Sequence, residues 1–189
     1  MFVDSHCHLD FPGLAEREDE ILATMAANDV GAALCISVRL EEFPRVRALA
    51  ERHAHLWASV GVHPDNADCE EPDLARLVAL ADHPRVVAIG ETGLDYHWHK
   101  DAPEWQRERF RTHIRAARAT GKPLIIHTRS AAEDTLRLMR EEKASEAGGV
   151  MHCFTESWEV AEAALELGFY ISFSGIVSFR NAKELKEVA

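Results

Sequence analysis

The sequence has no long hydrophobic run and no closely spaced pair of cysteines. A transmembrane helix needs about 20 consecutive apolar residues, and no segment of the 189 residues approaches that length. Residues 1–6 lack the basic region and apolar stretch of a secretory signal, so we expect a cytoplasmic protein with no membrane partner. The four cysteines are scattered without a CxxC motif, which predicts reduced thiols and argues against a disulfide framework.

The sequence is also poor in positive charge. Lysine and arginine total 21 against 32 acidic residues, which gives a formal net charge of −11. Proteins that bind nucleic acid without regard to sequence usually present a basic face. A nuclease built on this chain must therefore rely on a local site at which metal ions supply the positive charge.

What the sequence does contain is an alternation of short apolar runs with amphipathic segments. The apolar runs cover residues 2–6, 31–38, 56–62, 86–90, 123–127, 149–152 and 169–173. Continuous apolar runs of this length predict strands buried on both faces, as a parallel sheet requires. The amphipathic segments between them have helical spacing, notably after Leu14, Pro72, Pro103, Leu136 and Val160. This alternation predicts one α/β domain, either a doubly wound sheet or a (β/α)₈ barrel.

Most of these runs end in a residue that can bind a metal ion. The residues in question are His6, His8, His63, Glu91, His127 and His152. The carboxyl ends of barrel strands meet on one rim, where active sites sit, so these side chains should converge. His6 and His8 are two residues apart, which directs both to the same side of a strand. Imidazole and carboxylate groups suit zinc, manganese and similar ions, and the set favours a metal-assisted hydrolase in which Glu91 bridges two ions.

The remaining histidines and the cysteines near the proposed ligands are expected to be structural. A single histidine is more often a hydrogen-bonded or surface residue than a metal ligand. We expect that ordinary role for His53, His55, His83 and His113, and we do not expect His97 or His99 to be ligands. Cys7 and Cys153 each follow a proposed ligand, and neighbours on a strand point to opposite faces, so both should be packing residues.

Taken together, the motifs resemble the TatD family of metal-dependent deoxyribonucleases, which are amidohydrolase-like TIM-barrel hydrolases. The segments that carry the resemblance are residues 3–10, 61–64, 90–96, 123–129, 152–155 and 173–182. They follow the order of the family along the whole chain. The His-x-His pair alone is shared by many amidohydrolases, whereas the full set is specific.

The resemblance implies a TIM-type barrel with two divalent metal ions that hydrolyse phosphodiesters in DNA. The expected reaction is 3′-5′ exonuclease action on 3′ ends or single strands. By the same resemblance His6, His8 and Glu91 hold one ion, and Glu91, His127 and His152 hold the other. The residues do not fix the metal, because such sites accept zinc, manganese, magnesium or nickel.

The resemblance also implies roles at the rim for residues outside the ligand set. His63 and Arg129 would contact the scissile phosphate and join Glu91 in the catalytic set, although rim solvation and loop hydrogen bonding are the alternative for each. Asp95 and Tyr96 are expected to shape the loop after Glu91. The pair at residues 180–181 would either present a charge and a helix N-terminus to a phosphate or simply cap a helix.

The apolar runs stop at seven, and residues 183–189 are expected to form the helix after the seventh strand. A (β/α)₈ barrel typically takes about 250 residues, so the single hydrolase domain at residues 1–189 is expected to lack its eighth unit. In the family, the next strand normally ends in a metal-binding aspartate. Unpaired edges in an open barrel favour a fragment of a longer enzyme over a naturally short protein. We predict that the 189-residue form associates or is unstable.

Two other functions stay open at this stage. The same metal ions acting on a carbonyl group would give an amidohydrolase-type hydrolase of a small ester, lactone or amide. The acidic charge favours that reading, and the full motif set disfavours it. The second alternative is a truncated metal-binding remnant without hydrolytic activity.

Overall fold

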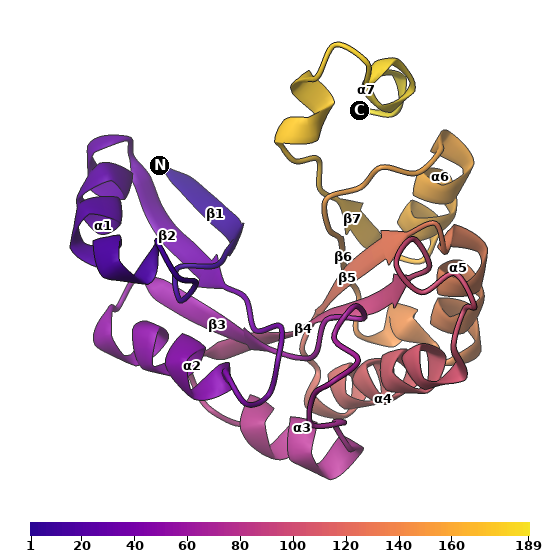
Figure 1. Ribbon diagram of the computed structural model, residues 1–189, viewed down its shortest axis with the longest axis horizontal. Helices are drawn as coiled ribbons and strands as arrows, with labels where there is room; N and C mark the ends of the chain where they lie inside the picture. Colours follow the sequence, from indigo (N-terminus) through magenta and orange to yellow (C-terminus); the bar gives the residue numbers. More distant parts are fainter.

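Seven parallel strands form one curled sheet in the computed structural model, which describes all 189 residues (Figure 1). Each strand pairs with the one that precedes it in the chain, so the order across the sheet is β1-β2-β3-β4-β5-β6-β7. The strands are β1 (Phe2–Cys7), β2 (Val30–Cys35), β3 (Leu56–Val60), β4 (Val86–Asp95), β5 (Leu124–Arg129), β6 (Gly149–Met151) and β7 (Phe169–Ile171). The seven apolar runs of the sequence correspond to these seven strands.

A helix follows each strand, and the first six connect successive strands. The helices are α1 (Glu18–Ala27), α2 (Phe43–Arg52), α3 (Leu74–Ala81), α4 (Glu104–Thr120), α5 (Ala132–Glu141), α6 (Trp158–Glu166) and α7 (Lys183–Val188). Short 3-10 helices lie at Ala15–Arg17 (η1), Ala144–Glu146 (η2) and Gly175–Ser178 (η3). None of the helices has the length and apolarity needed to cross a membrane.

Helix α2 is the one connecting helix that the periodicity of the sequence did not reveal. Its buried residues Phe43, Val46, Leu49 and Ala50 do recur at helical spacing. The helix is nevertheless hard to recognise, because charged residues surround these positions and Pro44 lies in its first turn. Proline is tolerated there because the first amide groups of a helix have no partner within the helix.

The hydrophobic core lies mainly between the sheet and the helices that cover its outer face. Cys35, Leu124 and Ile126 belong to this large cluster. Ile36 and Ile125, which alternate with them along the chain, belong to a separate small cluster. Since alternate residues of a strand point to opposite faces, the small cluster fills the concave side, as in a barrel interior.

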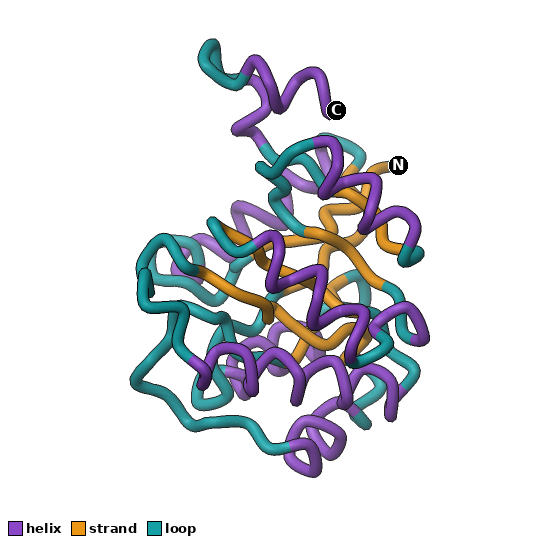
Figure 2. Tube along the Cα trace, turned by 90° about the vertical axis from the view of Figure 1, so that its right-hand side faces the viewer, coloured by secondary structure: helices purple, strands orange, loops and turns teal.

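The barrel is open between its first and last strands. Figure 1 shows β1 and β7 on opposite sides of a gap, with the C-terminal segment from η3 to α7 above it. The perpendicular view shows the same segment extending away from the strands (Figure 2). The gap leaves Phe2 and Val3 of β1 69% and 61% exposed, and Tyr170 of β7 79% exposed. The prediction of a TIM-type architecture with seven β/α units and no eighth is therefore confirmed.

Candidate metal centre

The carboxyl ends of the strands form an open cleft of about 800 Å³. Its lining includes all the strand-end residues that the sequence singled out: His6, His8, His63, Glu91, Arg129, His127 and His152. These residues come from segments far apart in the chain. They meet because parallel strands of one curled sheet all end on the same rim.

Glu91 lies at the centre of this group. Its side chain is 6% exposed, and its Oε2 atom is 3.2 Å from Nε2 of His6. The other carboxylate oxygen, Oε1, is 3.5 Å from Nδ1 of His127 and 3.7 Å from Nε2 of His63. Burial alone would raise the pKa of Glu91, but contacts with His127 and His6 outweigh it and hold the pKa well below its usual range. The carboxylate is therefore charged.

Close packing of β4 against β5 places His127 beside Glu91. Gly93 pairs with His127 in the parallel register, and its φ of +134° lies in a region that side-chain-bearing residues rarely adopt. A Cβ atom at Gly93 would overlap the carbonyl oxygen of His127. Gly93, the second glycine of the Gly-Glu-Thr-Gly segment, is thus required for the two strands to approach this closely.

Two groups of potential ligand atoms share the Glu91 carboxylate. One consists of His6, His8 and Glu91, and the other of His63, Glu91 and His127. Within each group the ligand atoms lie within 4.8 Å of one another. The resemblance had implied His152, not His63, as the partner of Glu91 and His127.

His152 lies next to His6 on the same rim. Its ring stacks on the ring of His6, with centroids 3.4 Å apart and planes at 3°. His152 lines the same cleft but belongs to neither group of ligand atoms. His63, expected at the phosphate, lines the same cleft, and its ring is 4.4 Å from that of His127. The sequence gives no signal that His63 also lies close enough to Glu91 and His127 to share a group of potential ligand atoms with them.

The side chains fit a divalent metal ion by their chemistry. Nδ1 of His6 and Nδ1 of His8 are buried and have no hydrogen-bond partner, which is costly for a polar atom unless something else satisfies it. Burial lowers the pKa of His8, and it lowers the pKa of His63 and His152 to about 4. These imidazoles are neutral, which is the form that binds metals.

Asp95 holds His127 from the side away from Glu91. Its Oδ2 atom accepts a hydrogen bond from Nε2 of His127 at 3.0 Å, and its Oδ1 accepts from the backbone N–H groups of His97 and Trp98. Burial alone would lower the pKa of His127, but Asp95 and Glu91 together raise it to about 9, so an ion that binds Nδ1 has to displace the proton held there. The expected loop-shaping contacts of Asp95 are present. The sequence analysis did not predict the contact of Asp95 with His127, because that contact depends on β4 continuing to Asp95 beside β5.

The other rim residues of the sequence analysis lie as follows. Arg129 ends β5 with its side chain exposed, and its guanidinium carbon is 5.7 Å from the ring centroid of Trp98. The Tyr96 hydroxyl donates to Asp134 at 2.7 Å and so ties the loop after β4 to α5.

The histidines assigned to ordinary roles lie outside the two ligand groups. His53 pairs with Glu18 at 2.6 Å, and His99 is 3.8 Å from Asp65. His113 is fully buried in α4, where its Nε2 accepts a hydrogen bond from the backbone N–H of Val62. The remaining members of this set, His55, His83 and His97, also belong to neither group.

Cys7 and Cys153 also make local contacts. Sγ of Cys7 lies 3.9 Å from Sγ of Cys35, across the pair of β1 and β2. Sγ of Cys153 lies 2.9 Å from the Ser174 hydroxyl, although Cys153 also lines the cleft. All four cysteines of the chain are free thiols.

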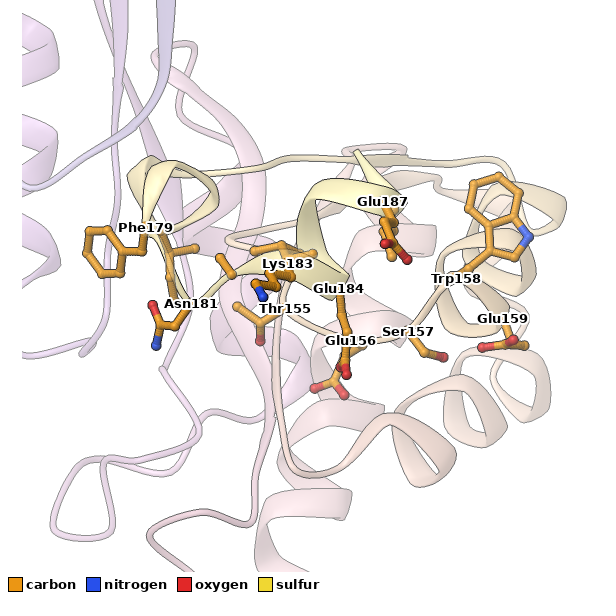
Figure 3. A pocket seen from close by; sticks show the side chains of 14 residues that line it. Thr155, Glu156, Ser157, Trp158, Glu159, Phe179, Asn181, Lys183, Glu184 and Glu187 are labelled. Atoms are coloured by element: carbon orange, nitrogen blue, oxygen red, sulfur yellow. The ribbon is translucent and has the colours of Figure 1, made fainter.

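Of the two roles considered for residues 180–181, the helix cap does not match the structure. Helix α7 begins at Lys183, its N-cap is Ala182, and no side chain caps it, so the pair is not a helix cap. Asn181 lines a different pocket, which lies between the α6 region and α7 (Figure 3). That pocket contains none of the candidate metal ligands and carries Glu156, Glu159, Glu184 and Glu187. Asn181 therefore does not join the phosphate side of the cleft.

A half-barrel of parallel strands with histidines and a shared carboxylate at its rim defines the class of the metal-dependent hydrolases. The family described as "TatD related DNase" matches residues 3–189. The chain belongs to this family and is a TatD-family metal-dependent hydrolase.

Individual relatives and a solved structure agree with this assignment. The chain is 46% identical over 190 residues to the Escherichia coli K12 protein named "Uncharacterized metal-dependent hydrolase YcfH", covering 99% of this chain and 71% of that protein. It is 32% identical over 176 residues to "3'-5' ssDNA/RNA exonuclease TatD" of Salmonella typhimurium LT2, covering 92% and 68%. The crystal structure of YJJV, a TatD homolog from E. coli K12, superimposes with a TM-score of 0.91 at 29% identity, covering 99% of this chain and 73% of YJJV.

Proposed function

We propose that this chain is a phosphodiester hydrolase that acts on DNA from the 3′ end and uses two divalent ions held around Glu91. The observation that carries the proposal is the sharing of one buried carboxylate by two groups of histidines. A carboxylate can bridge because each of its oxygens accepts from a separate direction. The Salmonella relative named as a single-stranded DNA and RNA exonuclease supports a nucleic-acid substrate.

The candidate ligands divide between the two ions as the ligand groups suggest. His6, His8 and Glu91 would hold one ion, while Glu91 and His127 would hold the other with His63 or His152. Such ions supply an activated water at neutral pH and neutralise the oxygens of an in-line phosphoryl displacement.

The chain's own residues position the reactants around that site. Asp95 fixes the ring of His127 so that Nδ1 faces Glu91. The exposed guanidinium of Arg129 lines the cleft and can pair with a phosphate oxygen of the substrate. The four free thiols agree with a reducing, cytoplasmic setting.

A second candidate function is hydrolysis of a small ester, lactone or amide at the same centre. The observation that favours it is the net charge of −11, which disfavours the approach of a polyanion. A metal-binding remnant without activity is the third possibility. This possibility predicts that adding an eighth strand ending in aspartate restores no hydrolytic activity.

The proposal is tested by labelling the 5′ end of a single-stranded oligonucleotide and following its shortening with Mg²⁺ or Mn²⁺. We expect a ladder of products that EDTA abolishes. Glu91→Gln removes the shared negative charge and should lower kcat/KM at least 100-fold and reduce the bound metal below that of the wild type, measured by elemental analysis. Absence of trimming by a metal-loaded chain, together with metal-dependent cleavage of a lactone or ester, would establish the second function.

A further inference from the structure

We propose that Trp98 is a stacking platform for an unpaired nucleobase next to the phosphate that is cleaved. The inference rests on the proposed function and specifies the substrate as a single strand with its bases free. Trp98 lies in the loop between β4 and α4, and 64% of its surface is exposed. The exposed face of this large ring is available to stack on an unpaired base.

The position of Trp98 is fixed relative to the candidate metal centre. Its backbone N–H donates to Oδ1 of Asp95 at 3.2 Å. The other oxygen of the same carboxylate, Oδ2, is 3.0 Å from Nε2 of His127. One buried carboxylate thus connects the backbone of the loop that carries the ring to a candidate ligand, and it holds that backbone close to the cleft.

Arg129 contacts both the Trp98 ring and the cleft. Its guanidinium carbon is 5.7 Å from the centroid of the Trp98 ring, and Arg129 itself lines the cleft. His97 contacts the ring at an interplanar angle of 85°, which is an edge contact. A strand whose phosphate pairs with Arg129 would bring the adjacent base within reach of the Trp98 ring.

The charge of the chain favours such a contact. A net charge of −11 disfavours binding that depends on phosphate contacts alone. Stacking of bases on aromatic side chains provides affinity without added positive charge and tolerates any base sequence. It also requires bases that are not already stacked in a duplex, so the platform selects single strands and frayed 3′ ends.

The test is a cycle that combines a change in the protein with a change in the substrate. The variants are Trp98→Ala, Trp98→Phe and, as a matched control, Trp158→Ala, whose ring is 50% exposed in the acidic pocket beside α6. The substrates are a thymidine oligonucleotide and the same strand with one abasic nucleotide, placed in turn at each of the three 3′-terminal positions. Steady-state rates give KM and kcat for each pair, and circular dichroism verifies that each variant is folded.

We expect Trp98→Ala to raise KM for the normal strand about 5- to 150-fold, the range expected for one base–aromatic stack. Trp98→Phe should recover most of the loss, and Trp158→Ala should change nothing. At one abasic position the effect of Trp98→Ala should disappear, because there is no base left to stack. An equal penalty on the normal strand and on every abasic strand would mean that Trp98 only supports its loop, and would overturn the inference.

Binding separates this inference from the proposed function. Fluorescence anisotropy of the same strands, labelled with a dye at the 5′ end, measures their affinity in Ca²⁺ without turnover. If the wild type cleaves no strand, the proposed function fails, and the binding cycle still decides on the platform. A base-dependent loss of affinity in Trp98→Ala supports it, and unchanged affinity overturns it.

Discussion

At the residue scale, Asp95 illustrates how one buried carboxylate serves both a ligand and a loop. It accepts a hydrogen bond from Nε2 of His127 and two more from the backbone of the following loop. Partners that orient a ligating histidine commonly contribute 10- to 100-fold to metal affinity. We therefore expect Asp95→Ala to weaken metal binding by about that factor. Competition with a chromophoric chelator measures the affinity, and the absorption spectrum of the Co²⁺-loaded protein reports the ligand geometry.

Two further variants distinguish orientation of His127 from support of the loop. Asp95→Asn keeps an acceptor oxygen, so it should restore part of the affinity. Asp134→Asn weakens the contact with the Tyr96 hydroxyl in the same loop but touches no candidate ligand, so it should leave metal affinity unchanged. Equal loss of affinity in Asp95→Ala and Asp134→Asn would show that only the loop matters.

At the element scale, α4 is attached to the end of β3 through a buried histidine. Nδ1–H of His113 donates to the carbonyl of Arg109 within α4, and Nε2 accepts from the N–H of Val62 just beyond β3. Burial lowers the pKa of His113 to about 4, below about 6.5 for an unfolded chain. The unfolded state therefore takes up the proton first as the pH falls. The stability that neutral His113 provides is complete above pH 6.5 and is lost as the pH falls toward 4.

The expected size of this effect is about 2 kcal/mol of unfolding free energy between pH 7.5 and pH 5. Urea denaturation at both pH values measures it. His113→Gln can accept from Val62 without titrating, so it should lower stability at pH 7.5 yet show a flatter dependence on pH than the wild type. Other histidines with lowered pKa values, such as His63, contribute equally to both proteins and cancel in the comparison. Parallel pH profiles would show that His113 does not titrate as expected.

The strands and helices also differ in how far the sequence predicts them. The strands and their shared rim followed from apolar runs that end in His6, Glu91 or His127, because parallel topology brings such ends together. Helix α2 was missed, because charges and Pro44 obscure its apolar spacing. The meeting of Asp95 with His127 and the inward turn of His63 depend on register and loop geometry, which periodicity does not encode.

At the scale of the whole molecule, the open barrel determines how the chain behaves in solution. Phe2, Val3 and Tyr170 expose apolar surface on the two edge strands, beside backbone groups that no strand pairs. Such edges are templates for pairing with another chain. We expect the 189-residue chain to associate as its concentration rises, which light scattering coupled to size-exclusion chromatography measures directly.

Charged side chains on edge strands suppress this kind of pairing. Val3→Lys and Tyr170→Lys, at positions that are 61% and 79% exposed, should each shift the chain toward monomer without loss of helical or strand content. Leu165→Lys is the matched control, since Leu165 is 49% exposed on helix α6 and is not part of an edge strand. Equal suppression by all three would indicate general solubility instead of edge pairing. A stable wild-type monomer at high concentration would mean that the gap between β1 and β7 needs no cover, because the core between the sheet and its helices stabilises the fold by itself.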